Sequence, residues 1–396
     1  MRSKERDVAA RLVLVDLHPA GLIGGCEKVF RQLARTAARR ASVTWLGSSC
    51  WFYRSLEVVY RILAMRAAPL RENNETLAGV DIVSTQPFSL IPFTTAWRQS
   101  RNRITSADVI YCKNEFLELC LVWFYGGDRA LHKTVVGMHS PVHVPAAATN
   151  WHRVHALLYK SALYRHLLSN ARQVHALSSA IDRDLDYVYG SRRMELSAMR
   201  ERILLIPNGV EQLPLRQRPP RATLQYLCVG RLAFQKGFDR LPSLLEMASI
   251  ERVTVVGDGD QAVTLRRAFG DRAEFLGALV QEQTLEELSV RDVLLMPSRW
   301  DNLPLTLLEA MAAGCIPIVS AVSELNEVLP GTLQWLAIDF DQPAAFLQCV
   351  RRVERCAADV GLDALRHTLR EHVREHFDEK RQLDRLTSAL LSKKSA

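Results

Sequence analysis

Several features that would assign this chain of 396 residues to a protein class are missing from it. Its eight cysteines form no CxxC pair, so we expect reduced, buried thiols and no zinc site. The first eleven positions are mostly polar and do not form a signal peptide. The longest apolar stretch, 116–125, includes Glu118 and is too short to cross a bilayer. These absences predict a protein of the cytoplasm.

The sequence also contains no nucleic-acid-binding module and no basic run with interleaved aromatic residues, so we expect no nucleic acid partner. The net charge of +8 is nevertheless uneven. Residues 1–210 carry 28 lysines and arginines against 17 acidic residues, whereas residues 211–396 carry 23 against 26. The basic first half predicts an anionic partner, for which an anionic membrane surface or a lipid-linked pyrophosphate fits best.

What the sequence does contain is a repeated alternation of short apolar strands with helical stretches. Strands are predicted at 12–17, 80–84, 108–112, 134–138 and, with a turn, 203–210 in the first half, and at 224–229, 253–257, 273–277, 293–296, 316–320 and 333–338 in the second. This alternation is typical of α/β proteins with doubly wound parallel sheets. The length allows two such domains, and the proline-containing stretch 211–221 is interpreted as their connection.

The segment 297–314 has the pattern of a ligand site. It leaves a buried strand, turns through Asn302 and Pro304, and enters an apolar helix. Backbone N–H groups at a helix N-terminus bind anions, and ligands of open α/β sheets lie at the carboxyl ends of the strands. Asp301 lies before the helix and Glu309 about one turn inside it. Both carboxylates can therefore flank a ligand held by the N–H groups.

A second loop, after the strand 224–229, carries two cations. Arg231 and Lys236 lie five residues apart on a turn that enters a helical stretch. An arginine gives a fixed two-pronged contact and a lysine a point charge, and the two can converge on one diphosphate. The pattern predicts an anion site, although such cations are often only solvated.

Two places in the first half fit a ligand site as well. The adjacent glycines Gly24 and Gly25 lie between the first strand and the first helix, in a turn that can bind an anion. His139 directly follows the strand 134–138, at the edge of the sheet where ligands bind. His143 is the alternative histidine.

These motifs resemble those of the retaining GT-B glycosyltransferases of family 4. The match covers most of the chain and is strongest from Ile206 to Glu327. It includes Gly24-Gly25-Cys26-Glu27-Lys28-Val29, Pro207-Asn208-Gly209-Val210, Gly230-Arg231-Leu232 followed by Lys236-Gly237, and an acidic residue, seven others and a glutamate before Ala310-Met311-Ala312. The family usually has Glu followed by Gly where this chain has Asp301 and Asn302.

The resemblance implies a fold. Two Rossmann-like, doubly wound domains would face a cleft, with an acceptor-binding domain at 1–211 and a nucleotide-sugar-binding domain at 222–376. The C-terminal helix, within 377–396, would return to the first domain.

The resemblance also implies a reaction and its residues. A hexose would pass, with retention and without a metal ion or other cofactor, from a nucleoside-diphosphate sugar to a hydroxyl of a lipid-linked or growing glycan acceptor. Such reactions build cell-surface polysaccharide and lipopolysaccharide. Arg231 and Lys236 would stabilise the leaving diphosphate, Glu309 would hold the ribose, and Asp301 and His139 would contact the sugar. Further donor contacts would come from Gly24, Gly25, Gly230, Asn302, Leu303, Pro304, Leu305 and Thr306.

The segment 51–71 mixes bulky apolar residues with four arginines. It fits a helix in a membrane interface, and equally the commoner case of a surface helix packed on the sheet. Because family members that act on lipid-linked acceptors attach to membranes through this region, the resemblance implies peripheral membrane association.

Other interpretations stay open. One is a catalytically inactive nucleotide-sugar-binding partner of another transferase, and another is a sugar-nucleotide epimerase of the same fold. A nicotinamide dehydrogenase ranks last, because glycines 21, 24 and 25 do not give the GxGxxG spacing. The short acidic pairs at 182 and 184, 258 and 260, and 339 and 341 are not expected to bind a metal, since such pairs arise readily by chance.

Overall fold

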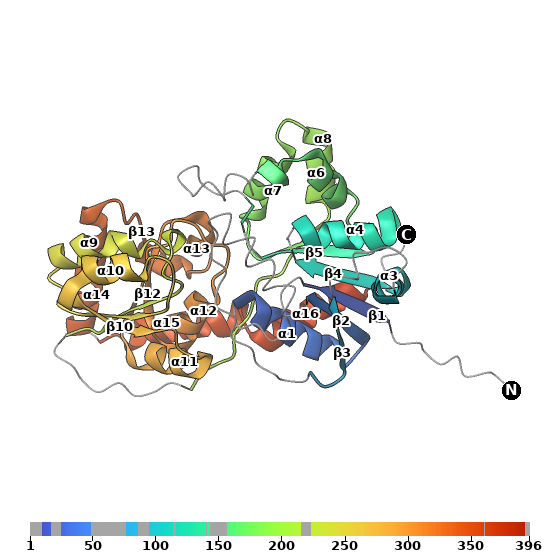
Figure 1. The fold of residues 1–396 in the computed structure, drawn as a ribbon. Helices are drawn as coiled ribbons and strands as arrows, with labels where there is room; N and C mark the ends of the chain where they lie inside the picture. Colours follow the sequence, from blue (N-terminus) through green and yellow to red (C-terminus); the bar gives the residue numbers. More distant parts are fainter. Residues whose placement is uncertain are drawn as a thin grey trace. The chain divides into compact units, whose positions relative to one another are not determined.

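The structure is a computed structural model that describes residues 10–16, 25–48, 77–85, 95–113, 116–139, 141–142, 157–214, 223–359 and 361–392. The chain divides into two compact units, which we call unit 1 (residues 1–206 and 383–396) and unit 2 (residues 207–382). Each unit is built around one parallel sheet (Figure 1). The expected fold class, two doubly wound α/β domains, is confirmed.

Unit 1 contains a sheet of seven parallel strands in the order β3-β2-β1-β4-β5-β6-β7. The strands are β1 Arg11–Val15, β2 Ser42–Ser48, β3 Val80–Thr85, β4 Val109–Lys113, β5 Thr134–Met138, β6 Gln173–Ala176 and β7 Ile203–Leu205. The helices are α1 Gly25–Ala37, α3 Thr95–Ser106, α4 Phe116–Leu131, α6 Ala162–Ser169, α7 Ile181–Tyr189, α8 Arg193–Arg200 and, for its larger part, α16 Glu379–Leu391.

Alternate residues of the unit 1 strands build two separate cores, because successive side chains of a strand point to opposite faces. Val13 and Val15 pack with α4, α6 and α7 on one face, whereas Leu12 and Leu14 pack with α1 and α16 on the other (Figure 1). Burial on both faces explains why these strands appear in the sequence as continuous apolar runs.

The last helix, α16, ends in the core of unit 1. Leu386 and Leu390 are buried there with the residues of α1. The guanidinium of Arg172 donates to the carbonyl of Ser392 at 2.7 Å, which fixes the end of the helix. The chain therefore closes unit 1 with a segment 177 residues beyond Ile206, which ends its first part.

Unit 2 contains a sheet of six parallel strands in the order β10-β9-β8-β11-β12-β13. The strands are β8 Tyr226–Val229, β9 Val253–Val256, β10 Ala273–Gly277, β11 Val293–Met296, β12 Ile316–Ser320 and β13 Ala337–Ile338. The α-helices are α9 Leu241–Met247, α10 Ala262–Phe269, α11 Gln281–Val290, α12 Leu305–Ala313, α13 Ser323–Asn326, α14 Pro343–Asp359 and α15 Asp363–His376. Short 3-10 turns are η2 Phe234–Lys236, η3 Phe238–Arg240, η4 Gly270–Arg272 and η5 Gly331–Leu336.

The helix α12 is the most buried element of unit 2. Its residues from Leu307 to Ala313 are buried apart from Glu309, and it packs on α11 and α15. The small side chains of Ala310, Ala312 and Ala313 allow that close approach. Gly314 ends the helix in the left-handed conformation, with φ of 74°.

Several local predictions differ from the structure. The predicted strand 333–338 is wrong over most of its length, since 331–336 form a 3-10 turn and only Ala337 and Ile338 pair with β12. Two strands, β2 and β6, were not predicted. All six cysteines that the structure describes are free thiols, and four of these are buried. None of the described helices has both the length and the apolar character that a membrane span requires.

Candidate functional site

The strand order of unit 2 reverses between β8 and β11. Strands β9 and β10 continue the sheet from β8, and β12 and β13 continue it from β11. In sheets of this order, ligands bind outside the carboxyl ends of the two strands at which the order reverses. The loops at this place are 230–237 after β8 and 297–304 after β11. Both loops carry residues that the sequence predicted for the site.

Glycines let the loops at this edge pack backbone against backbone. Gly237 has φ of 68°, and a Cβ atom added there would lie 2.0 Å from the carbonyl oxygen of Pro297. A Cβ atom added at Gly257, after β9, would lie 1.9 Å from the carbonyl oxygen of Gly230. No side chain fits at either distance, so these two glycines set how closely the loops approach one another.

Lys236 and Asp301 form an ion pair that joins the two loops. Lys236 Nζ lies 2.5 Å from Asp301 Oδ2, and the two side chains are only 18% and 11% exposed. Ser298 Oγ donates to the same carboxylate oxygen at 3.3 Å. The stem of Lys236 extends over Gly230, where an added Cβ would lie 3.7 Å from its Cγ and Cδ. The structure thus brings together Gly230, Lys236 and Asp301.

Arg299 holds the loop after β8 in place from the other side. Its guanidinium makes two parallel hydrogen bonds to Asp239, at 2.8 and 2.7 Å, and donates to the carbonyl of Phe234 at 2.7 Å. It also lies 3.9 Å from the centre of the Phe234 ring. The hydrogen bonds from Arg299 lower the pKa of Asp239 below its ordinary value. These contacts fix the turn that presents Lys236.

The sequence analysis did not single out Arg299 and Asp239. A signal was present, because Arg299 lies two residues before Asp301 and Asp239 three residues after Lys236. Charges of opposite sign at the ends of two loops that meet at one sheet edge are candidates for a pair.

Arg231 lies on the same loop but makes a different contact. Its side chain is exposed, and Nη2 lies 3.4 Å from Oε1 of Gln235. In turn, Nε2 of Gln235 donates to the carbonyl of Trp300 at 3.2 Å. The convergence of Arg231 and Lys236 on one anion stays a prediction.

The helix α12 begins at the same edge of the sheet. Its N-cap is Pro304, and Leu305 and Thr306 are its first residues. A helix leaves the N–H groups of its first turn without acceptors inside the helix, which favours an anion at this end. Asn302 and Leu303, directly before the helix, are buried and support its first turn.

Glu309 lies in the second turn of α12. Its side chain is partly buried, and Oε1 accepts a hydrogen bond of 3.2 Å from Nε2 of Gln281, at the start of α11. Because the carboxylate has further lone pairs, it can accept hydrogen bonds from a second group.

In unit 1, the structure describes only part of the predicted site. Gly25 is the first residue of α1. Gly24, His143 and the predicted amphipathic segment 51–71 lie outside the described residues. His139 directly follows β5, is 8% exposed, and its Nε2 lies 2.8 Å from the hydroxyl of Tyr111. The ring of His139 thus contacts the polar interior of unit 1.

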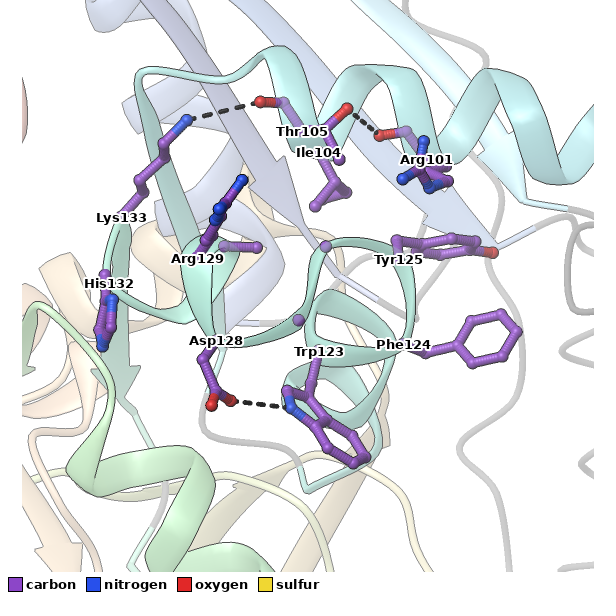
Figure 2. A pocket seen from close by; sticks show the side chains of 13 residues that line it. Arg101, Ile104, Thr105, Trp123, Phe124, Tyr125, Asp128, Arg129, His132 and Lys133 are labelled. Atoms are coloured by element: carbon purple, nitrogen blue, oxygen red, sulfur yellow. Dashed lines mark hydrogen bonds between the residues drawn. The ribbon is translucent and has the colours of Figure 1, made fainter.

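A groove of about 1180 Å³ lies between α3 and α4 on unit 1. Figure 2 shows basic side chains toward one end (Arg129, His132 and Lys133) and aromatic ones toward the other (Trp123, Phe124 and Tyr125). Trp123 and Phe124 are 40% and 45% exposed. Asp128 holds the indole N–H of Trp123 at 2.9 Å, which fixes the ring. No residue predicted for the site lines this groove.

The part of unit 2 that carries these loops matches a known family. Residues 223–355 match the family model described as glycosyl transferases group 1. They form a group 1 glycosyltransferase domain. The match includes the whole of both loops, α12 and the ion pair between Lys236 and Asp301.

Similar proteins support this assignment of the glycosyltransferase domain. One of them belongs to the phosphatidylinositol N-acetylglucosaminyltransferase of Arabidopsis thaliana and is 28% identical over 148 residues, 34% of this chain and 33% of that protein. The chain thus spans about a third of the length of this relative.

Two solved structures are similar over nearly the full chain. An Anabaena protein solved with UDP and glucose has a TM-score of 0.66 at 16% identity, covering 96% of this chain and 99% of that one. A lipopolysaccharide outer core galactosyltransferase has a TM-score of 0.66 at 17% identity, covering 97% of this chain and 100% of that one. The likeness shows that the chain, with its glycosyltransferase domain, has the GT-B fold.

Proposed function

We propose that the chain is a glycosyltransferase that moves a hexose from a nucleoside-diphosphate sugar to a hydroxyl group, with retention of the anomeric configuration. The observation that supports this most is the ion pair between Lys236 and Asp301, which lies across the strand reversal of a group 1 glycosyltransferase domain. A cation, a carboxylate and a helix N-terminus then meet where α/β sheets bind nucleotides. The Anabaena structure contains UDP and glucose, which favours a sugar nucleotide as the donor.

Each predicted residue has a role in this reaction. Lys236 and Arg231, with the N–H groups of Leu305 and Thr306, stabilise the negative charge that develops on the diphosphate. Glu309 accepts hydrogen bonds from the two ribose hydroxyls, and Asp301 accepts hydrogen bonds from the sugar. These side chains supply the positive charge that a divalent metal supplies in other transferases, so we propose a reaction without a metal ion.

The transfer exchanges one bond of the sugar for another. The bond between the anomeric carbon and the diphosphate oxygen breaks, and its electron pair leaves with the diphosphate. The acceptor oxygen forms its bond to the anomeric carbon on the same face. Its proton passes to an oxygen of the leaving diphosphate, so no additional protein base is required.

We propose a lipid-linked or growing glycan as the acceptor, as in the synthesis of cell-surface polysaccharide or lipopolysaccharide. The names of the two similar enzymes favour this choice, since one acts on phosphatidylinositol and the other on the outer core of lipopolysaccharide. An acceptor of this kind lies at a membrane surface. We therefore propose a cytoplasmic protein that associates peripherally with the membrane.

The groove between α3 and α4 fits an anionic bilayer surface as its partner. α3 carries three arginines and no acidic residue, and the groove adds Arg129 and Lys133. Trp123 and Phe124 are the kind of side chain that inserts at the level of the lipid headgroups. Cations attract the anionic surface and aromatic rings anchor in it, so one face supplies both contributions.

The donor site is tested by thermal shift with UDP, GDP and ADP. We expect at least one nucleotide to raise the melting temperature, because a ligand that binds only the folded state stabilises it. Product analysis with the matching sugar nucleotides and a lipid-linked acceptor then tests transfer, and the rate in EDTA tests independence from metal. A chain that none of the three nucleotides stabilises does not have the proposed donor site.

The membrane partner is tested by co-sedimentation with vesicles of phosphatidylcholine, with and without phosphatidylglycerol. We expect binding to the anionic vesicles alone, and weaker binding of the variants Arg101→Glu and Trp123→Ala. The control is Arg193→Glu, which makes the same charge change on α8, outside the groove. Equal loss with Arg193→Glu would show that only net charge matters, and would contradict a role of the groove.

A catalytically inactive partner of another transferase is the second candidate, because Asp301 and Asn302 depart from the Glu and Gly that are usual in the family. Nucleotide binding without transfer to any acceptor would favour it. Conversion of the donor when no acceptor is present would instead favour an epimerase.

A further inference from the structure

One face of the unit 1 sheet carries a row of polar side chains between α1 and the strands. Tyr111 on β4 and His175 on β6 lie on this face, separated by Gly137 on β5, which is paired in register with His175. His139 follows on the same side, two residues after Gly137. Phe30 of α1 covers the row, with its ring centre 5.3 Å from that of Tyr111 and 5.9 Å from that of His139.

Gly137 makes the row possible because it leaves space across the middle strand. Neighbouring strands are about 4.8 Å apart, so Tyr111 and His175 lie two strand spacings from one another. The Tyr111 side chain crosses the gap and brings its hydroxyl over Gly137. A Cβ atom added there would lie 2.4 Å from Tyr111 Oη and 2.8 Å from His139 Nε2. Every other residue type would displace both groups.

The polar groups form a chain of three short hydrogen bonds. The Tyr111 hydroxyl lies 2.8 Å from His139 Nε2 and 2.7 Å from His175 Nδ1. His175 Nε2 lies 2.8 Å from the carbonyl oxygen of Ile206. Tyr111 and His175 are 0% and 1% exposed, and His139 is 8% exposed. Water therefore does not compete for these bonds.

The carbonyl at the end of the chain assigns every proton in it. A carbonyl can only accept, so His175 carries its proton on Nε2. Burial lowers the pKa of His175 to about 4, which keeps its ring neutral at pH 7 and leaves Nδ1 as an acceptor. Tyr111 must then donate its single proton to His175. Its oxygen can only accept from the other side, so His139 donates from Nε2.

We propose that Tyr111 and His175 are positioning residues that fix the ring of His139 and hold its neutral form in the tautomer with the proton on Nε2. The ring of His139 then offers Nδ1 as a hydrogen-bond acceptor. A hydroxyl group that meets this ring must donate to it. The catalytic consequence of this arrangement rests on the proposed transferase function, whereas the tautomer does not.

The tautomer is tested by NMR on the full chain labelled with ¹⁵N-histidine, since the shifts of the two ring nitrogens distinguish the tautomers. The signals of His139 are assigned with the variant His139→Gln. We expect the Nε2–H form for His139, and a mixture of tautomers in Tyr111→Phe. The control is Tyr189→Phe, which removes a hydroxyl bonded to Ser169 Oγ at 2.9 Å on the opposite face of the sheet.

Two further variants keep the test sharp if Tyr111→Phe folds poorly. In His175→Asn, the side-chain oxygen stands near the position of Nδ1 and still accepts from Tyr111. In His175→Gln, the amide N–H stands near Nε2, and Tyr111 loses its acceptor. We expect His139 to keep one tautomer in the first variant and to lose it in the second. An Nδ1–H form in the natural protein, or a His139 tautomer unchanged in both Tyr111→Phe and His175→Gln, would overturn the proposal.

Activity provides the second readout. We expect Tyr111→Phe to lower kcat by about tenfold, with the thermal shift by the donor nucleotide unchanged, because the predicted nucleotide residues are on unit 2. A loss of nucleotide binding would contradict a role limited to positioning His139. If the natural protein transfers no sugar, the proposed function fails, and the NMR experiment still decides the tautomer.

Discussion

Lys236 Nζ lies 2.5 Å from Asp301 Oδ2, and this contact joins the loops that leave the two central strands of unit 2. Both side chains are more than four-fifths buried, so neither charge is well solvated. A diphosphate that binds here must share Lys236 with Asp301. The ground state of the proposed donor site is thus already neutralised in part, and the second positive charge must come from Arg231.

Removal of Lys236 tests the centre of the proposed site. We expect Lys236→Ala to lower kcat/KM by about a hundredfold or more, because a preorganised cation beside the leaving group is lost. Stability should fall by about 2 kcal/mol, between the values for exposed and buried pairs, since Asp301 stays behind without its partner. The double variant Lys236→Ala with Asp301→Ala should recover part of that stability but no activity. An unchanged rate in Lys236→Ala would remove this residue from the mechanism.

Replacement of Glu309 by glutamine tests the ribose contact. The substitution keeps the size of the side chain but removes its charge and one acceptor. We expect the Kd for the donor nucleotide to rise by about ten- to a hundredfold, because hydrogen bonds to a charged group are the stronger ones. Isothermal titration measures it, and Gln281→Ala serves as the control, since it removes only the neighbour that bonds Glu309 at 3.2 Å. Equal affinities of Glu309→Gln and the natural protein would contradict the assignment.

The close contact of the two loops is tested at Gly237. Gly237→Ala should destabilise unit 2 and weaken nucleotide binding, because its Cβ would lie 2.0 Å from the carbonyl of Pro297. Gly361→Ala is the matched control, since Gly361 also has a positive φ, of 74°, but nothing within 4 Å of the added carbon. We expect about 1 kcal/mol for the control, from backbone conformation alone, and clearly more for Gly237→Ala. Equal losses would show that the contact with Pro297 does not matter.

The buried ring of His175 makes the stability of unit 1 depend on pH. Its pKa is about 4 in the folded chain, against an ordinary value of 6.5. Between these two pH values the unfolded chain binds a proton that the folded chain does not, so the free energy of unfolding falls as the pH falls from 6.5 to 4. The full effect is about 3 kcal/mol.

Denaturant unfolding at pH 7 and pH 4.5 measures this effect in the natural protein and in His175→Gln. The other titrating groups contribute to both proteins, so the difference between them reports His175. We expect the loss of stability in acid to be smaller in the variant. The same loss in both would show that the folded chain tolerates a charge on His175.

The sequence predicted the sheets well where buried strands appear as apolar runs, as in Val293–Met296. It missed β2 and β6 because Ser42–Ser48 and Gln173–Ala176 contain polar residues whose contacts are set by the fold. The hydroxyl of Thr44 and the ring of His175, for example, are buried among neighbours distant in the sequence. The apolar segment 333–336 forms a 3-10 turn instead of a strand, since Leu333 N–H bonds to the carbonyl of Pro330 at 2.8 Å.

For the candidate site, motif spacing indicated which residues to examine but not what they contact. The sequence suggested that Lys236 and Asp301 would each bind the ligand, and the structure places them against one another. The chain from His139 through Tyr111 to His175 links residues up to 64 positions apart, and only the strand order brings them together. Their shared parity on three neighbouring strands was the available signal, but it required the order of those strands.

The hydrogen-bonded chain behind His139 ends at the carbonyl of Ile206, which is the last residue of unit 1 before the polypeptide passes into unit 2. That oxygen is therefore both the terminus of a proton-ordered relay and the exit point of the backbone. A displacement of the exit by a few tenths of an ångström would lengthen the bond to His175, release Tyr111, and set the imidazole of His139 free to rotate. The orientation of one ring thus reports the tension at the junction where the two units are tied.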